Sequence, residues 1–392
     1  MFVQEKQETN VPALGLYVHV PFCSTTCDFC AFYQEKPSKK AFEEFFLGLR
    51  SEFERFPGDR DFSTVFIGGG TPGLLSSSQL DDLCRIIRGA GLVDACEWTV
   101  EVAPSEINQA KLDVLAENGV SRISLGVQTF SSVMMKSLGR AHKVEKALAA
   151  YAMIREKAAF HINLDLLFGA PGQTLEMWEV DLKTAAELEP DHLSTYCLTF
   201  EEDTAMYLRL SDGKVELDIE REAEFYEKAW TVLPQFGYPQ YEVSNFSKAG
   251  HACLHNLNTW RMNEWIGYGP GASSQYRNVR RKNSANLEKW SRSMVSGEKP
   301  VYDEYLKVGG NDLAGDAILF GLRMNEGVNL NDLAVRFDLC PGCLKSVRSF
   351  FRELAGEGLM LEVDGCSILT QEGRMLCDAI ASEIPEVEDQ ES

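Results

Sequence analysis

The stretch that decides the fold covers residues 17–30 and reads Tyr17-Val18-His19-Val20-Pro21-Phe22-Cys23-Ser24-Thr25-Thr26-Cys27-Asp28-Phe29-Cys30. Its apolar, β-branched start predicts a buried strand over Gly15–Val20. Cys23, Cys27 and Cys30 follow as a C-x3-C-x2-C array on the loop after that strand. Three closely spaced thiolates on one loop can hold three irons of a four-iron cluster, which leaves the fourth iron open to a small molecule.

Zinc is the main alternative for this array, because zinc also binds thiolates. A structural zinc site normally has four ligands, often in two C-x-x-C pairs, and no second pair lies nearby in the sequence. His19 is a candidate fourth ligand under that interpretation. Three unrelated cysteines are the remaining alternative.

Outward from this stretch, strand-like and helix-like runs alternate over the first 240 residues. The predicted strands are Gly15–Val20, Ser63–Ile67, Trp98–Val102, Arg122–Val127, His161–Phe168 and His192–Leu198. The predicted helices are Lys39–Arg55, Ser78–Gly89, Glu106–Asn118, Val144–Lys157, Thr174–Leu188 and Glu220–Phe236. Such alternation implies parallel strands joined by right-handed crossovers. Six units predict an α/β fold with a partial (β/α)6 barrel.

The pattern changes near residue 240. Residues 239–275 are rich in aromatics, Gly and Asn and are expected to form loops across the barrel mouth, and 282–308 a polar connection with a short helix near Leu287–Val295. Three helical runs and a hairpin around Asp364-Gly365 then predict a small winged-helix-like domain. The expected parts are an N-terminal arm (1–13), the barrel (14–238), the barrel-mouth and connecting segment (239–310), the C-terminal domain (311–380) and an acidic, disordered tail (381–392).

Composition excludes several classes of protein. Lys and Arg number 38 against 59 Asp and Glu, so the formal net charge is −21. So acidic a chain repels phosphate backbones, and nucleic acid is not an expected partner. No run approaches eighteen apolar residues and no signal peptide is recognisable, so we expect no integral membrane segment and a cytoplasmic location. The eleven cysteines are then expected to stay reduced, with Cys340 and Cys343 as free thiols.

The C-x3-C-x2-C array after a first strand resembles the radical S-adenosylmethionine (SAM) enzymes. The longer string Tyr-x-His-x-Pro-Phe-Cys is similar to that of oxygen-independent coproporphyrinogen III oxidases and their HemW-type heme-chaperone relatives, and the resemblance spans about residues 14–380. It implies a radical SAM barrel with one [4Fe-4S] cluster on Cys23, Cys27 and Cys30. It also implies that SAM chelates the open iron, and that an electron from the cluster cleaves SAM to methionine and a 5′-deoxyadenosyl radical.

The resemblance also implies which residues contact SAM. They follow successive predicted strands and are Tyr17, Gly69, Gly70, Thr71, Glu101, Gln128, Arg140 and Asp165. The residue types suit the ligand, because glycines allow close approach of the backbone, carboxylates accept hydrogen bonds and Arg pairs with a carboxylate. Each residue alone also has an ordinary interpretation as a turn, a solvated strand end or a structural salt bridge. No catalytic residue is assigned.

Two features separate the oxidase from the chaperone. The oxidase carries a further cysteine two residues after the array, where this chain has Phe32, and it has a longer arm before the cluster than the 22 residues found here. The HemW-type relatives carry an H-N-x-x-Y-W motif linked to heme, and this chain has His255-Asn256-Leu257-Asn258-Thr259-Trp260, with Thr259 in place of Tyr. His255 is therefore the candidate heme ligand, with Cys253 as an alternative and an ordinary hydrogen-bonding role in a loop as the other interpretation.

The sequence is thus interpreted as a radical SAM [4Fe-4S] protein of the HemW type that binds heme and delivers it to acceptor hemoproteins. The alternative is the oxidase, which decarboxylates coproporphyrinogen III to protoporphyrinogen IX; that activity is not expected here. Expected partners are heme or a porphyrin, an acceptor hemoprotein, and an electron donor such as flavodoxin or ferredoxin.

Overall fold

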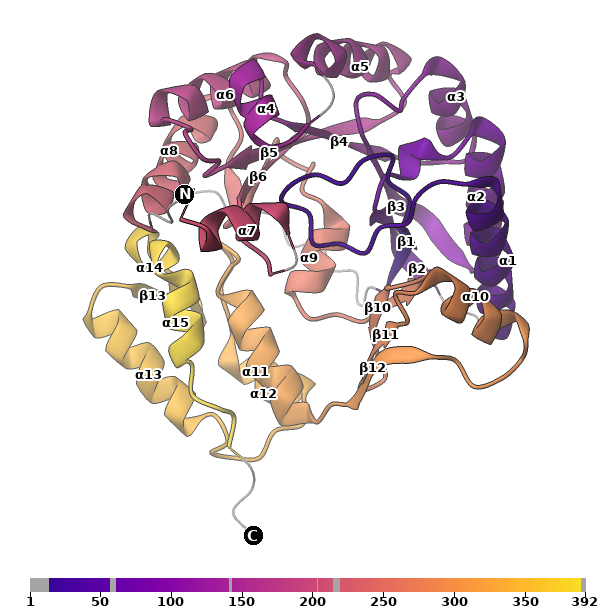
Figure 1. Ribbon diagram of the computed structural model, residues 1–392. Helices are drawn as coiled ribbons and strands as arrows, with labels where there is room; N and C mark the ends of the chain where they lie inside the picture. Colours follow the sequence, from indigo (N-terminus) through magenta and orange to yellow (C-terminus); the bar gives the residue numbers. More distant parts are fainter. Residues whose placement is uncertain (1–13, 57–60, 141–142, 203, 214–218, 389–392) are drawn as a thin grey trace.

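The computed structural model describes residues 14–56, 61–140, 143–202, 204–213 and 219–388 (Figure 1). The predicted N-terminal arm, residues 1–13, and the last four residues of the tail lie outside this range. The described chain is built on one sheet with the strand order β12-β11-β10-β9-β1-β2-β3-β4-β5-β6-β8-β7 and on a separate two-stranded hairpin.

Six consecutive strands of this sheet are parallel. They are β1 (Leu14–Val20), β2 (Phe62–Gly69), β3 (Leu92–Val102), β4 (Arg122–Gln128), β5 (His161–Phe168) and β6 (His192–Cys197). The helices that connect them line the outer face in Figure 1: α1 (Lys39–Arg55), α2 (Ser77–Arg88), α3 (Gln109–Glu117), α5 (Val144–Lys157) and α6 (Leu175–Glu187), with α8 (Ile219–Gln235) after β6. The predicted α/β partial barrel is confirmed.

Local sequence explains where these helices begin. The Ser38 hydroxyl accepts a hydrogen bond from the Ala41 amide and caps α1, and Ser76 and Gln79 form a reciprocal capping box at α2. Two short helices were not expected from the sequence: η1 (Pro72–Leu74, a 3-10 turn) and α4 (Ser132–Ser137). A third, α7 (Ala205–Ser211), lies in Figure 1 beside the long loop between β1 and α1.

The expectation of loops over residues 239–275 is wrong. This part of the chain forms β7 (Gln240–Glu242), β8 (Asn245–Ser247), α9 (Leu254–Trp260), β9 (Trp265–Tyr268) and β10 (Ser273–Tyr276), and β11 (Val279–Asn283), α10 (Leu287–Val295) and β12 (Tyr302–Lys307) follow. β9 pairs in parallel with β1, and β8 pairs with β6, so both edges of the barrel sheet are extended. Strands of three to five residues show no periodicity in sequence and form here because an existing edge offers unpaired backbone groups.

The C-terminal region is helical with a hairpin, as expected. It contains α11 (Gly310–Gly321), α12 (Leu330–Arg336), α13 (Lys345–Gly356), the hairpin β13 (Met360–Val363) and β14 (Cys366–Leu369), α14 (Gln371–Met375) and α15 (Cys377–Glu383). Two expectations are corrected here. Cys340 and Cys343 form a disulfide, because the C-x-x-C turn brings their Cα atoms to 5.4 Å. The tail is ordered through Glu388, whose amide donates to the Cys343 carbonyl.

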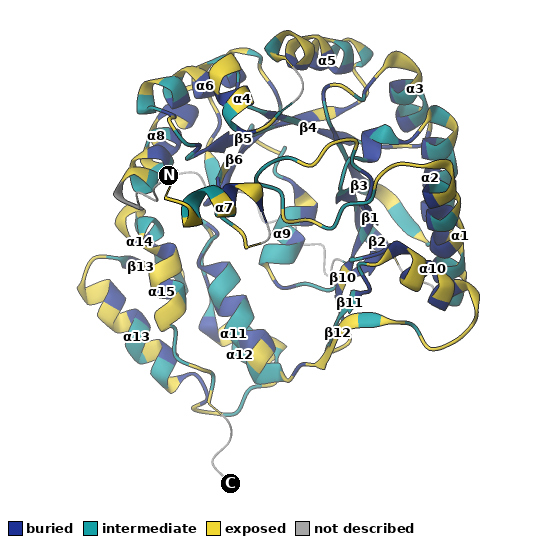
Figure 2. Ribbon diagram, in the orientation of Figure 1, coloured by how far each residue is buried: buried dark blue, intermediate teal, exposed yellow. Residues whose placement is uncertain are grey.

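Buried residues concentrate on the sheet and on the inward faces of the helices (Figure 2). Most belong to one hydrophobic cluster that continues from the barrel strands into α11, α12 and α13. The barrel and the C-terminal region therefore share a core. Among the described residues, no helix has the length and apolar character needed to cross a membrane.

Candidate cluster and cofactor site

The three cysteines of the array lie on the loop that follows β1, which crosses the centre of the view in Figure 1. Two backbone hydrogen bonds tie this loop to the end of β2: Gly70 donates to the Val20 carbonyl at 2.8 Å, and Thr71 donates to the Phe22 carbonyl at 2.7 Å. The Cys23 Sγ lies 3.5 Å from the Thr71 Oγ1. These bonds therefore join two loops into one unit: the loop after β1 that carries the cysteines (residues 21–38, the cysteine loop) and the loop at the end of β2 (residues 68–71, the glycine loop).

The glycine loop has no space for side chains. A Cβ atom on Gly70 would lie 2.6 Å from the Phe22 carbonyl oxygen, and one on Gly69 would lie 2.6 Å from the His19 ring. Gly69 also has a φ of +108°, which strongly favours glycine. The sequence therefore needs glycine here so that the backbone can lie against the cysteine loop.

The thiols of this loop are free and half-buried. Burial raises the pKa of the Cys23 and Cys27 thiols, while the nearby Arg140 guanidinium acts in the opposite direction. The Gln34 side-chain amide donates to the Cys30 Sγ at 3.0 Å. Three thiols on one loop with a cation beside them are the donor set that an iron–sulfur cluster needs, because the bound metal holds them as thiolates.

Two acidic residues predicted as SAM contacts lie in the barrel interior. Glu101 on β3 accepts a hydrogen bond from the Gly69 amide at 3.2 Å. Burial, followed by repulsion from Asp165, raises the pKa of Glu101 to about 8, and burial also raises the pKa of Asp165. Two half-buried carboxylates that repel each other favour a ligand that brings positive charge or hydroxyl donors between them.

Arg140 connects this acidic pair to the cysteines. Its guanidinium lies 5.5 Å from the centre of the Phe29 ring on the cysteine loop and acts electrostatically on Asp165. Its Nε is buried and has no hydrogen-bond partner among the described residues. A buried guanidinium nitrogen without an acceptor suits an anionic group of a ligand, so the residues present fit a cluster with SAM bound beside it.

The remaining two predicted SAM contacts flank the same region. Gln128 ends β4, the strand between those that carry Glu101 and Asp165, and it has a φ of +69° at a register shift in the β4–β5 pair. Such a conformation is uncommon for glutamine, and backbone strain of this kind clusters at functional sites. Tyr17 on β1 contacts the Nδ1 of His19 through its hydroxyl at 3.1 Å, and burial raises the pKa of Tyr17.

Sequence reasoning missed the residues that position Asp165. Ser124 donates to one carboxylate oxygen of Asp165 at 2.8 Å, and the Asn163 amide donates to the other at 2.8 Å. The Asn163 oxygen contacts the His192 Nδ1 at 2.6 Å, and the His192 Nε2 contacts the Tyr241 hydroxyl at 2.8 Å. The available signal was the period of two, because Asn163 and Asp165 lie on the same face of β5.

His255, the predicted heme ligand, is not part of this site. It lies on α9 with its side chain buried, and its Nδ1 contacts the Thr64 Oγ1 at 2.9 Å. Thr64 precedes Gly69 by five residues on β2, which places their Cα atoms about 16 Å apart along the strand. The alternative ligand Cys253 lies beside it, with its Sγ 3.6 Å from the Oε1 of Glu97. Burial lowers the pKa of His255 to about 4 and raises that of Cys253 to about 12.

The chain is similar to known proteins in sequence and in fold. Residues 17–185 match the family description "Radical SAM superfamily". The chain is 33% identical to the heme chaperone HemW of Bacillus subtilis over 369 residues, covering 92% of this chain and 96% of that protein. It is 37% identical to the heme chaperone HemW of Escherichia coli over 272 residues, covering 67% and 70% of the two chains.

Among solved structures, the coproporphyrinogen III oxidase HemN of Escherichia coli, a radical SAM enzyme, superimposes with a TM-score of 0.82. The superposition covers 95% of this chain and 91% of that chain at 23% sequence identity. At that identity the likeness concerns the fold. The arrangement of barrel and C-terminal region described above is therefore one that a known protein shares.

Proposed function

Because the chain belongs to the HemW family of the radical SAM superfamily, we propose that it is a heme chaperone that delivers heme to acceptor hemoproteins in the cytoplasm. The observation that carries the proposal is the cysteine loop fixed against the glycine loop, in a chain whose relatives over nearly their full length are heme chaperones. We propose that Cys23, Cys27 and Cys30 hold one [4Fe-4S] cluster, which supplies a single electron when it is bound.

In this proposal the chain's own residues bind and orient SAM. Gly69, Gly70 and Thr71 offer the close backbone approach, Arg140 pairs with the SAM carboxylate, and Glu101 with Asp165 accept from its amino and hydroxyl groups. Tyr17 and Gln128 complete the proposed contacts. An electron donor such as flavodoxin or ferredoxin would reduce the cluster.

The oxidase activity is the competing function, and the position two residues after Cys30 argues against it. Phe32 occupies that position with 67% of its surface exposed, where the oxidase has a further cysteine. The exposed aromatic ring is no substitute for a thiol. An anaerobic assay with coproporphyrinogen III, SAM and a reductant is expected to give no protoporphyrinogen IX, and sustained turnover would reject the chaperone proposal.

We further propose His255 as the heme ligand through Nε2, which accepts or donates no hydrogen bond among the described residues. Since its side chain is buried, α9 must move away from β2 before iron can reach it. The full chain, titrated with hemin anaerobically, is expected to retain about one heme, to show a Soret band and to transfer the heme to an apo-hemoprotein. Absence of any retained heme would contradict the proposed function itself.

A matched pair of variants tests the ligand separately. His255→Ala is expected to lose the Soret band of ligated heme. Thr64→Val removes the same Thr64–His255 hydrogen bond but leaves the imidazole in place, so it is expected to retain heme. Heme retention by His255→Ala would leave chaperone function intact and reject His255, and Cys253→Ser would then test the other ligand.

A further inference from the structure

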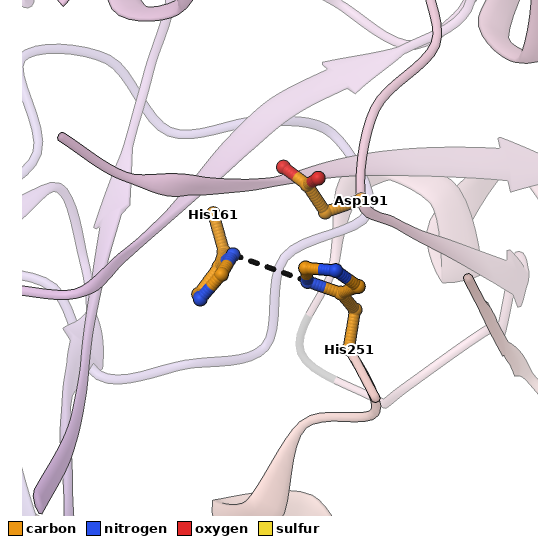
Figure 3. A group of neighbouring side chains, drawn as sticks. All are labelled: His161, Asp191 and His251. Carbon is orange, nitrogen blue, oxygen red and sulfur yellow. Dashed lines mark hydrogen bonds between the residues drawn. The ribbon is translucent and has the colours of Figure 1, made fainter. Parts of the chain in front are cut away.

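A group of metal-binding side chains lies at the other end of the barrel from the cysteine loop. His161 is the first residue of β5, Asp191 directly precedes the first residue of β6, and His251 lies between β8 and α9. One ligand atom from each of the three residues lies within 4.8 Å of the other two (Figure 3). Parallel strands place their first residues at the opposite edge from their last, so this group is distinct from the candidate cluster site.

The two imidazoles are already at the spacing that one ion requires. The Nδ1 atoms of His161 and His251 lie 3.1 Å apart, with the ring planes at 73°. With metal–nitrogen bonds of about 2.05 Å, two nitrogens at 3.1 Å subtend about 98° at the ion, which lies between the octahedral and tetrahedral angles. The two nitrogens form a hydrogen bond with each other, and an ion would replace its proton without bringing the rings closer together.

Asp191 is oriented by partners that leave one of its oxygens available. Its Oδ2 accepts from the Ile162 amide at 2.8 Å and from the Arg155 guanidinium at 3.3 Å. Its Oδ1 takes part in no hydrogen bond among the described residues. Carboxylates that bind metals are typically held in this way by groups that do not contact the ion.

The segment that carries His251 is held as firmly. Arg122 donates to the main-chain carbonyls of His251 and Ala252 at 3.0 and 3.3 Å, and it pairs with the buried Glu97. The Lys248 amide donates to the Asp191 carbonyl at 3.0 Å. These bonds already fix Asp191 and the segment that carries His251. The binding of an ion therefore costs little conformational entropy in the side chains and the loop.

We propose that His161, His251 and Asp191 bind one divalent transition-metal ion of the zinc class. Two imidazoles and a carboxylate suit zinc, and three protein ligands leave a fourth position for water at this accessible surface. The ion would join the starts of β5 and β6 to the segment that leads into α9. The proposal uses no residue of the cluster site and stands whether or not the chain carries heme.

Calorimetric titration of the cluster-loaded full chain with zinc chloride tests the site. The chain has other thiols, so the decisive quantity is the difference between wild type and the double variant His161→Ala/His251→Ala. We expect wild type to bind one more equivalent of zinc. Equal stoichiometry and affinity in both proteins would overturn the proposal.

Three further variants separate ligand loss from a disturbed loop. Asp191→Asn retains an oxygen for Ile162 and Arg155 but removes the anionic ligand, so zinc affinity is expected to fall about tenfold or more. Its control, Asp113→Asn, alters an exposed carboxylate paired with Lys157 at 2.6 Å and is expected to leave zinc binding unchanged. His251→Gln conserves a polar side chain at this position and must lose the extra equivalent as well; zinc bound normally by this variant would also overturn the site.

Discussion

Glu101 shows how a single residue of the site lowers the stability of the folded protein. Its pKa is raised from 4.5 to about 8, chiefly by burial and then by Asp165. Between these values the folded protein keeps a proton that the unfolded chain releases, so the free energy of unfolding falls as pH rises from about 4.5 towards 8. The residue is therefore held in an unfavourable environment that a ligand with positive charge would relieve.

The variant Glu101→Gln cannot ionise and should lose this dependence. In the protein without cofactors, we expect the decline in unfolding free energy between pH 5 and pH 8 to be smaller than in wild type, by on the order of 2 kcal/mol. Denaturant unfolding at several pH values measures it. Glu145→Gln, on the exposed face of α5, is the control and should follow wild type; a wild-type slope in Glu101→Gln would contradict the assignment.

At the scale of elements, the contact between the cysteine loop and the glycine loop leaves no space for one methyl group. A Cβ on Gly70 would lie 2.6 Å from the Phe22 carbonyl oxygen and 2.8 Å from the Pro21 carbonyl carbon. Both neighbours are backbone, so Gly70→Ala must push the two loops apart. We expect the free energy of unfolding to fall by about 1–3 kcal/mol. After anaerobic reconstitution, we expect each chain to hold fewer than the four irons of a complete cluster.

Gly315→Ala is the matched control for that variant. Gly315 lies inside α11, and a Cβ there meets nothing within 4 Å. Alanine is the better helix former, so this variant should gain about 0.5–1 kcal/mol and reconstitute normally. Melting temperature and iron content measure both variants. A Gly70→Ala protein with wild-type iron content would show that the two loops do not form a single unit.

Sequence periodicity predicted the helices and strands that are long enough for their pattern of buried and exposed residues to repeat several times. His161–Phe168 and Val144–Lys157 were predicted with the bounds that they have in the structure. The three residues of Gln240–Glu242 and of Asn245–Ser247 cannot display a period, and they become strands only through their pairing with each other and with β6. For the same reason the sequence did not reveal the group of His161, Asp191 and His251. Its members are far apart in the sequence, and the pairing of the strands brings them together.

At the scale of the whole molecule, the barrel depends on the chain that follows it. β9 pairs with β1, and the buried Glu52 on α1 accepts from the Gly269 amide and from the Asn283 side chain, both at 2.8 Å. Trp290 on α10 lies so close to α1 that a Cβ on Gly48 would lie 2.7 Å from its ring. Residues 239–308 therefore complete the first unit of the barrel.

Chains cut at two points test this dependence. A chain of residues 1–238 exposes the edge of β1 and the face of α1 that Trp290 covers, so we expect it to aggregate on expression. A chain of residues 1–308 keeps all twelve strands of the described sheet but loses its contacts with the C-terminal region, among them the hydrogen bond from the Val243 amide to the Arg323 carbonyl and the part of the shared core that α11, α12 and α13 supply. It should remain partly soluble and keep the far-ultraviolet signal of the sheet. Equal solubility of the two chains, measured by sedimentation after lysis, would show that the barrel folds without its added strands.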